Sequence, residues 1–135
     1  MEGRKQEVLY YREPSGRCAF RDWRAGIADE RAKAAIDARI ARFRGGNFGD
    51  SAPIGAGASE SRIDLGPGFR IYYGREDDVI VLLCGGDKST QTADIRQAKF
   101  FWTDYKKRTS NERRERAVAN ARLQRRSSRR SKKKP

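Results

Sequence analysis

The sequence predicts an α+β fold, in which helices pack against an antiparallel sheet. Three segments, residues 60–65, 69–74 and 79–84, are predicted as the successive strands of a meander. In the first two segments apolar and polar side chains alternate, as they do in a strand with one buried face. The third segment, VIVLLC, is apolar throughout, which indicates a central strand or one covered on both faces.

The turns and faces of this meander follow from the same stretch. Residues 66–68, Gly-Pro-Gly, suit the first turn, because proline presets its own φ and glycine adopts a positive φ without a Cβ clash. Residues 76–78 supply the second turn. The alternation gives one apolar and one polar face, so Arg62 and Arg70 are expected to point the same way. Tyr72, two residues from Arg70, is expected on that polar face.

A strand and a helical hairpin are predicted ahead of the meander. Residues 7–11, EVLYY, form the strand, Ser15 is expected to cap the first helix and Asp29 the second. Each helix has an apolar stripe that requires a partner, and the apolar face of the meander supplies one. The stripes consist of Phe20, Trp23 and Ile27 in the first helix, and of Ile36, Ile40 and Phe43 in the second.

A loop is predicted between the hairpin and the meander, and a helix after it. Residues 45–59 contain five glycines and a proline, which disfavour a regular element. No GK[ST] or GxGxxG pattern accompanies them at a strand-to-helix turn, so a phosphate-binding loop is not predicted. Ser89 or Thr90 is expected to cap the last helix. The apolar stripe of that helix consists of Ile95, Ala98, Trp102 and Tyr105.

The positive charge is concentrated at the C-terminal end. Residues 1–107 are expected to form the folded domain, and residues 108–135 a basic tail with 12 Lys and Arg against 2 Asp and Glu, or +10 of the overall +13. Such a tail favours a polyanionic partner, most simply nucleic acid, although a passive solubilising end is the alternative. A capping-box pattern at residues 109–112 predicts a frayed helix followed by disorder. The tail residues expected to bind RNA are Arg113, Arg114, Arg125, Arg126, Arg129 and Arg130.

The cysteine and histidine content argues against several kinds of site. The chain has no His, and Cys18 and Cys84 lie far apart without a CxxC motif, so a zinc site and a His-based triad are disfavoured. Both cysteines are expected to be buried thiols, and no metal or other cofactor is expected. Because no apolar run is long enough for a membrane span or a signal peptide, we expect a cytoplasmic protein with no membrane partner. The oligomeric state stays open.

Three motifs, in order along the chain, resemble one known family. GNFGD at residues 46–50, SRIDLGPGFRIYY at 61–73 and VIVLLCGGDKSTQTADI at 79–95 resemble the HigB-like, phage-derived addiction-module killer proteins of the RelE/ParE toxin superfamily. The resemblance covers roughly residues 8–108, so the basic tail lies outside it.

The resemblance implies a RelE-like toxin fold, in which the N-terminal strand and the helical hairpin pack on a three-stranded meander that precedes the C-terminal helix. It also implies the toxin of a type II toxin–antitoxin system, neutralised by a helix-turn-helix antitoxin. Toxins of this kind cleave mRNA on the ribosome as metal-independent endoribonucleases. The ribose 2′-oxygen attacks the adjacent phosphate and leaves a cyclic phosphate and a 5′-hydroxyl.

Four residues are expected to form the catalytic site: Arg62, Arg70, Tyr72 and Lys88. Arg70 matches the phosphate-contacting arginine of the family, Arg62 matches the basic position one strand earlier, and Lys88 lies near the basic residue after the last strand. A guanidinium can bind two oxygens of a phosphate on which negative charge grows. Tyr72 is expected to stack on a base or to transfer a proton. The general base stays open between Tyr72, Asp64 and the ribosome.

The chain departs from the family at two positions, and two other functions stay open. Ala52 stands where a lysine is common, and Ser61 stands where a leucine is common. The missing lysine removes one expected RNA contact and leaves room for a decayed toxin. The alternatives are a ParE-like inhibitor of DNA gyrase and a non-catalytic nucleic-acid-binding protein that acts through its basic tail.

Overall fold

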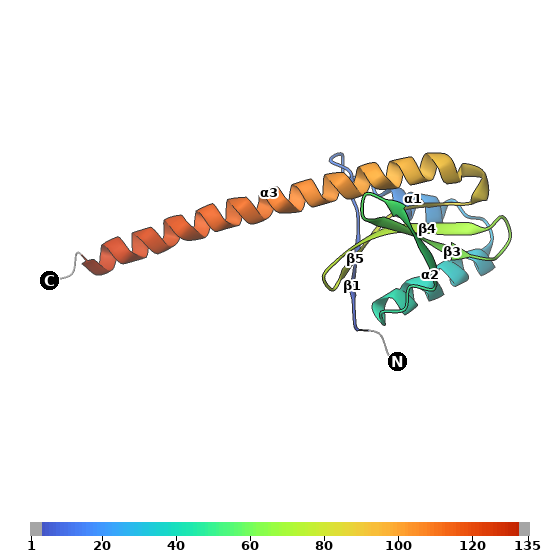
Figure 1. Cartoon of the computed structure of the whole chain (residues 1–135), viewed down its shortest axis with the longest axis horizontal. Helices are drawn as coiled ribbons and strands as arrows, with labels where there is room; N and C mark the ends of the chain where they lie inside the picture. Colours follow the sequence, from blue (N-terminus) through green and yellow to red (C-terminus); the bar gives the residue numbers. More distant parts are fainter. Residues whose placement is uncertain (1–3, 133–135) are drawn as a thin grey trace. The chain divides into compact units, whose positions relative to one another are not determined.

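The computed structural model describes residues 4–132 of the chain, with side chains up to residue 128. It confirms the α+β class (Figure 1). The elements are β1 (Glu7–Tyr10), α1 (Ala19–Ala25), α2 (Glu30–Arg44), β2 (Asp50–Gly55), β3 (Ala58–Ile63), β4 (Phe69–Glu76), β5 (Val79–Gly86), the 3-10 helix η1 (Lys88–Thr90) and α3 (Gln91–Lys132). The chain divides into two compact units, with the boundary between Thr103 and Asp104.

The sheet of the first unit has five strands in the order β1-β5-β4-β3-β2. The predicted meander corresponds to β3, β4 and β5, which pair antiparallel. The three-stranded meander is confirmed, and the sheet extends beyond it, because β1 pairs parallel with β5 at one edge and β2 pairs antiparallel with β3 at the other. The sheet is therefore mixed, and the meander forms its centre.

Strand β2 lies within residues 45–59, which were predicted as a loop, so that prediction was wrong. The glycines of this segment flank the strand: Gly49 and Gly57 adopt positive φ values of 63° and 85° just outside it. Between them residues 50–53 pair in register with β3. The glycine content therefore marks two turns, and the short polar strand between them has little propensity of its own.

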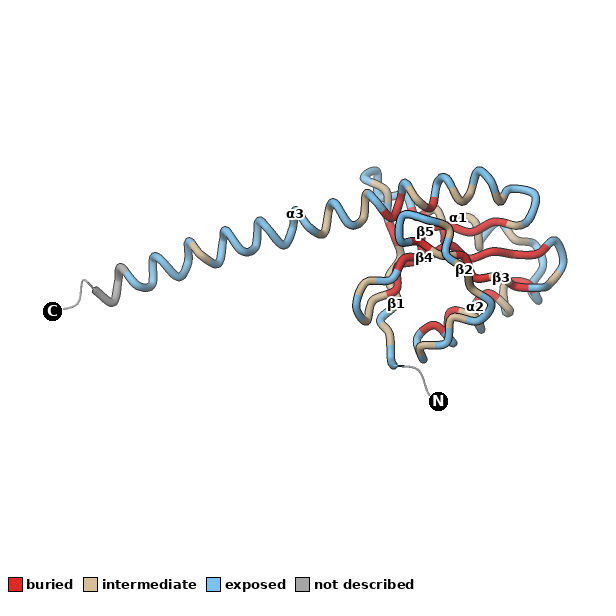
Figure 2. Tube along the Cα trace, viewed as in Figure 1, coloured by how far each residue is buried: buried red, intermediate tan, exposed pale blue. Residues whose placement is uncertain are grey.

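Helices cover both faces of the sheet. The helical hairpin of α1 and α2 packs on one face, as predicted, with Phe20, Ile36 and Phe43 in the main core. The first turns of α3 cover the other face, where Ala98 and Trp102 are buried. The predicted polar face is thus wrong for the centre of the sheet. The first six residues of β4 are all buried, and Figure 2 shows β4 and β5 as the most buried strands.

The helix starts agree with the predictions only in part. Asp29 caps α2 as predicted and accepts a hydrogen bond of 2.9 Å from the backbone N–H of Arg31. Ser15 does not cap α1, because that helix begins at Ala19, after Cys18, which makes no side-chain cap bond. The turn before α3 is capped by Asp87 and not by a residue of η1.

The second unit consists of the C-terminal part of α3, which continues without a break to Lys132. The predicted capping box at residues 109–112 therefore lies inside a helix. The hydroxyl of Thr109 donates to the carbonyl of Tyr105 at 3.0 Å, within that helix. No glycine or proline occurs from residue 91 to 132, so nothing interrupts the helix, and the predicted helix of the tail extends to Lys132. Residues 133–135 lie outside the described part.

None of the helices in the described residues combines the length and apolar character needed to cross a membrane.

The close packing of α3 on β4 depends on a glycine. A Cβ atom at Gly74 would overlap the indole ring of Trp102. We expect Gly74→Ala to lower the free energy of unfolding by about 1–3 kcal/mol, because a buried indole must shift to admit the methyl group. Urea unfolding measures this loss. The control is Gly45→Ala, where the Cβ atom would lie 3.5 Å from its nearest neighbour. Equal losses in both variants would contradict the steric explanation.

Candidate functional site

The strand register places a polar row across four strands of the sheet. Asp50 of β2 pairs with Arg62 of β3, Arg62 pairs with Arg70 of β4, and Arg70 pairs with Gly86 of β5. Residues directly opposite each other in antiparallel strands point to the same face, at spacings of about 5 Å. The prediction that Arg62 and Arg70 share a face is therefore confirmed. This is the face that the first turns of α3 cover.

A pocket of about 380 Å³ opens at the end of this row. Its polar lining residues are Asp50, Arg62, Asp64, Arg70 and Lys88, and Ile63, Gly68 and Phe69 complete the wall. Three of the four residues expected in a catalytic site, Arg62, Arg70 and Lys88, thus surround one pocket. Sequence reasoning missed Asp50, because it assigned that residue to a loop.

Arg70 is buried, with an exposed fraction of 7 %. The expectation of an outward, solvent-exposed arginine was wrong, because α3 covers the face to which it points. Its Nη1 atom lies 3.7 Å from Oε1 of Glu60, an ion pair without a hydrogen bond. Neither Nε nor Nη1 of Arg70 has a hydrogen-bond partner among the described residues. A desolvated guanidinium with unused donors at a pocket favours an anionic ligand.

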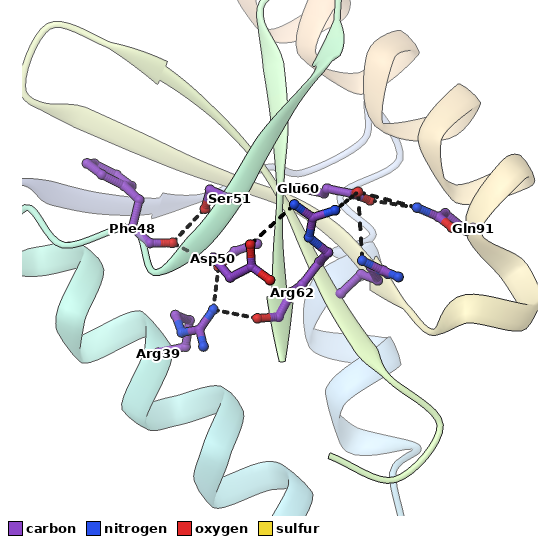
Figure 3. A network of polar contacts seen from close by, with 9 residues as sticks. Arg39, Phe48, Asp50, Ser51, Glu60, Arg62 and Gln91 are labelled. Carbon is purple, nitrogen blue, oxygen red and sulfur yellow. Dashed lines mark hydrogen bonds and ion pairs between the residues drawn. The ribbon is translucent and has the colours of Figure 1, made fainter. Parts of the chain in front are cut away.

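Glu60 is the buried counter-ion of the site, with an exposed fraction of 5 %. Both of its carboxylate oxygens accept hydrogen bonds from Nε2 of Gln91, at 3.1 and 3.3 Å (Figure 3). Its Oε1 atom also lies 3.8 Å from Nη1 of Arg62. Sequence reasoning did not identify Glu60, although its alternation with Arg62 in β3 placed both side chains on one face.

Arg62 is held from two sides. Its Nη2 atom lies 3.2 Å from Oδ1 of Asp50, and its backbone carbonyl accepts a hydrogen bond of 2.8 Å from Arg39 of α2 (Figure 3). The same nitrogen of Arg39 donates to the hydroxyl of Ser61 at 2.7 Å, and that hydroxyl donates to the carbonyl of Phe48 at 3.0 Å. Burial lowers the pKa of Arg39. Ser61, one of the departures from the family pattern, therefore links α2 to β3.

Lys88 lies at the exposed rim of the pocket. Its aliphatic stem packs over the turn at Gly68, where a Cβ atom would come within 3.0 Å of the lysine side chain. Asp87 fixes the backbone here by accepting a hydrogen bond of 2.8 Å from the N–H of Ser89. The hydrogen bond from the Ser89 hydroxyl lowers the pKa of Asp87, which keeps this cap ionised.

Tyr72 does not line the pocket and has no exposed surface. Burial raises the pKa of its phenol, and Glu60 adds to the effect, so the group stays neutral at physiological pH. Base stacking or proton transfer by Tyr72 does not fit this position. Burial likewise raises the pKa of Cys84, its partner in β5, to about 12. Two carboxylates remain at the pocket as candidates for a general base, Asp64 and Asp50.

The predicted RNA-binding arginines belong to the second unit. Arg113, Arg114, Arg125 and Arg126 are exposed on α3, whereas the side chains of Arg129 and Arg130 lie outside the described part. In the part of the chain that the structure describes, no three His, Cys, Asp or Glu side chains gather as they would around a metal ion.

The fold and pocket define an α+β protein whose mixed five-stranded sheet presents two arginines and a lysine around one cavity. The chain is 52% identical over 83 residues to a protein of Haemophilus influenzae that is described as uncharacterized, a match that covers 61% of this chain and 84% of the relative. The chain belongs to the same family as that protein. No family model and no solved structure matches the chain.

The buried position of Tyr72 predicts how Tyr72→Phe changes the free energy of unfolding and its dependence on pH. Its buried hydroxyl has no hydrogen-bond partner among the described residues, so its removal should leave the free energy of unfolding equal or up to about 1 kcal/mol higher at neutral pH. Because folding raises the pKa of the phenol, ionisation of Tyr72 favours the unfolded state and lowers the stability of the wild type only as the pH rises above about 10.

Urea unfolding at about pH 7 and about pH 11 tests both statements. Tyr72→Phe should lose less stability between the two pH values than the wild type, and the lysines common to both proteins cancel. Cys84→Ala is the parallel control for the second buried acid on these strands. A wild-type loss that Tyr72→Phe does not reduce would contradict the buried, neutral phenol.

Proposed function

We propose that this protein is the toxin of a type II toxin–antitoxin system and cleaves mRNA as a metal-independent endoribonuclease. The main support is the convergence of Arg62, Arg70 and Lys88 on one pocket, in which Arg70 is buried with unused donors. The resemblance of three motifs to HigB-like toxins points to the same activity. RNA is the substrate because the reaction needs a 2′-hydroxyl beside the phosphate.

The pocket fits the charge changes of this reaction. When the 2′-oxygen attacks phosphorus, negative charge grows on the non-bridging oxygens, and the guanidinium of Arg70 is positioned to bind them. Its burial strengthens the interaction, because the local dielectric is low and the group does not have to reorganise. As the bond from phosphorus to the 5′-oxygen breaks, Lys88 at the exposed rim, or a water molecule, supplies the proton that turns this oxygen into the 5′-hydroxyl. The proton of the 2′-hydroxyl passes to Asp50, Asp64 or a group of the ribosome.

Partners and location follow from this activity. A translating ribosome supplies the mRNA, so the protein acts in the cytoplasm, and a helix-turn-helix antitoxin neutralises it. A ParE-like gyrase inhibitor has no need for three cations around one pocket. The pocket therefore favours the ribonuclease over gyrase inhibition, and a cleavage assay separates the two.

We expect Lys88→Ala to reduce the single-turnover cleavage of ribosome-bound mRNA by about 100-fold, since removing one charge-stabilising donor has an effect of this size. Lys88 is exposed, so the fold should be unaffected. Expression of the wild type should arrest growth, and expression of Lys88→Ala should not. The matched control is Arg96→Ala, which removes one exposed positive charge from α3 away from the pocket lining.

Two outcomes would count against the proposal. Soluble wild-type protein that neither arrests growth nor cleaves ribosome-bound mRNA would exclude an active ribonuclease. Equal cleavage by Lys88→Ala and wild type would remove Lys88 from the site.

The basic part of α3 supports a second element of the proposal, a tether for RNA. From Arg108 onward the net charge is +10, and the described arginines of this part are exposed or half-exposed. Arg114, Arg122 and Arg125 are spaced by 8 and 3 residues, which places them within about 80° of one another on the helix. They extend over roughly 16 Å, a length that reaches several phosphates of one RNA strand.

For this tether we expect weaker RNA binding when Arg113, Arg114, Arg125, Arg126, Arg129 and Arg130 are all changed to Gln. Each lost phosphate contact should lower the slope of log affinity against log salt by about 0.7 to 0.9. Cleavage at saturating ribosome concentration should not change, because the pocket is intact. Fluorescence anisotropy with a labelled RNA stem-loop at several salt concentrations measures both effects.

The control carries Lys at the same six positions and should retain the affinity and the slope, because charge alone is kept. A Gln variant that binds like the wild type would show that this part of the helix only solubilises the protein.

A further inference from the structure

We infer that Glu60 is a positioning residue. It is an internal counter-ion that holds Arg70 and Arg62 in place, and together with the phosphate of the substrate it balances their positive charge. The identity of the anion as an RNA phosphodiester rests on the proposed function, whereas the counter-ion role rests on the structure alone. No motif or relative assigns a role to this residue.

The geometry separates the strong contacts of Glu60 from its weak ones. Its hydrogen bonds go to Gln91, at 3.1 and 3.3 Å, and these fix the carboxylate at the start of α3. Its contacts to Arg70 and Arg62, at 3.7 and 3.8 Å, are ion pairs beyond hydrogen-bond distance. Glu60 therefore balances the charge of both guanidinium groups without forming a hydrogen bond to either.

Burial makes this balance necessary. The side chains of Arg70 and Glu60 are only 9% and 7% exposed, and a buried guanidinium without an opposite charge is strongly unfavourable. Glu60 supplies that charge from behind, since it is absent from the pocket lining. Nε and Nη1 of Arg70 are buried and have no hydrogen-bond partner in the described part of the chain. Because Arg70 also lines the pocket, a phosphate bound there would meet a guanidinium whose hydrogen bonds are not all satisfied within the protein. Asp50 pairs with Arg62 at 3.2 Å and its side chain is 69% exposed, so its influence is smaller.

Glu60→Gln separates positioning from general stability. The amide keeps the shape of the side chain and removes its charge, so the pocket becomes more positive and an added phosphate becomes the missing counter-ion. Phosphate should then bind more tightly, and the fold should depend on it more. Arg70 should be less well fixed, so kcat for cleavage should fall by roughly tenfold or more while KM stays equal or falls. The loss of a purely structural residue would not raise the affinity for phosphate while lowering kcat.

The experiment compares full-length wild type, Glu60→Gln and Asp37→Asn by thermal unfolding in inorganic phosphate and in chloride at equal ionic strength. Asp37 pairs with Arg24 through hydrogen bonds of 2.8 and 2.6 Å outside the pocket lining, so Asp37→Asn is a control for the loss of an unrelated ion pair. We expect phosphate to raise Tm more in Glu60→Gln than in the other two proteins. An equal shift in all three would overturn the inference.

A second variant, Gln91→Ala, keeps the inference testable if Glu60→Gln stays unfolded even in phosphate. This change removes the hydrogen bonds that fix the Glu60 carboxylate and keeps its charge. Gln91→Ala should then lower kcat with little change in KM, and a variant with wild-type kcat would overturn the inference. If wild type cleaves no RNA but the phosphate shift follows the expected order, the counter-ion role stands and the ribonuclease proposal fails.

Discussion

The ion pair of Arg70 and Glu60 is the interaction on which the pocket depends. Arg70 lies on a central strand whose two faces are both covered, so its charge is out of water and must be balanced inside the protein. Glu60, on the neighbouring strand, provides the balance, and Gln91 at the start of α3 fixes Glu60. One buried arginine thus links β3, β4 and the first turn of α3.

The covering helix explains why the pocket lies where it does. A Cβ atom at Gly86, at the end of the polar row, would overlap the carboxylate of Asp94, so this position has to lack a side chain for α3 to pack closely. Thr90 donates a hydrogen bond to the same carboxylate, and burial raises the pKa of Asp94. The start of α3 is thereby held against β5. Arg62, Arg70 and Lys88 remain open to the pocket at its edge.

The sequence patterns predicted to which face of the sheet the side chains point, but not which face a helix covers. Alternation in two short strands placed Arg62 and Arg70 on one face, and the register confirms it. The same alternation was interpreted as a polar, open face, because the apolar stripe of α3 carries no information on which side of the sheet it packs. The burial of Arg70 and Tyr72 therefore could not be predicted. Asp50 was missed since β2 is short and polar and is stabilised mainly by its pairing with β3.

The register also changes the meaning of Ala52, where the family pattern commonly has a lysine. Ala52 pairs with Glu60 across β2 and β3, so a lysine there would share the face of Glu60 and compete with Arg62 and Arg70 for its carboxylate. With alanine at this position, Glu60 interacts with the two arginines and Gln91. Alanine in place of lysine therefore removes a cation from the paired positions of Ala52, Glu60 and Tyr72. The neighbouring pair of Arg62 and Arg70, which lines the pocket, is not affected. On this reasoning the missing lysine alone does not indicate a decayed site.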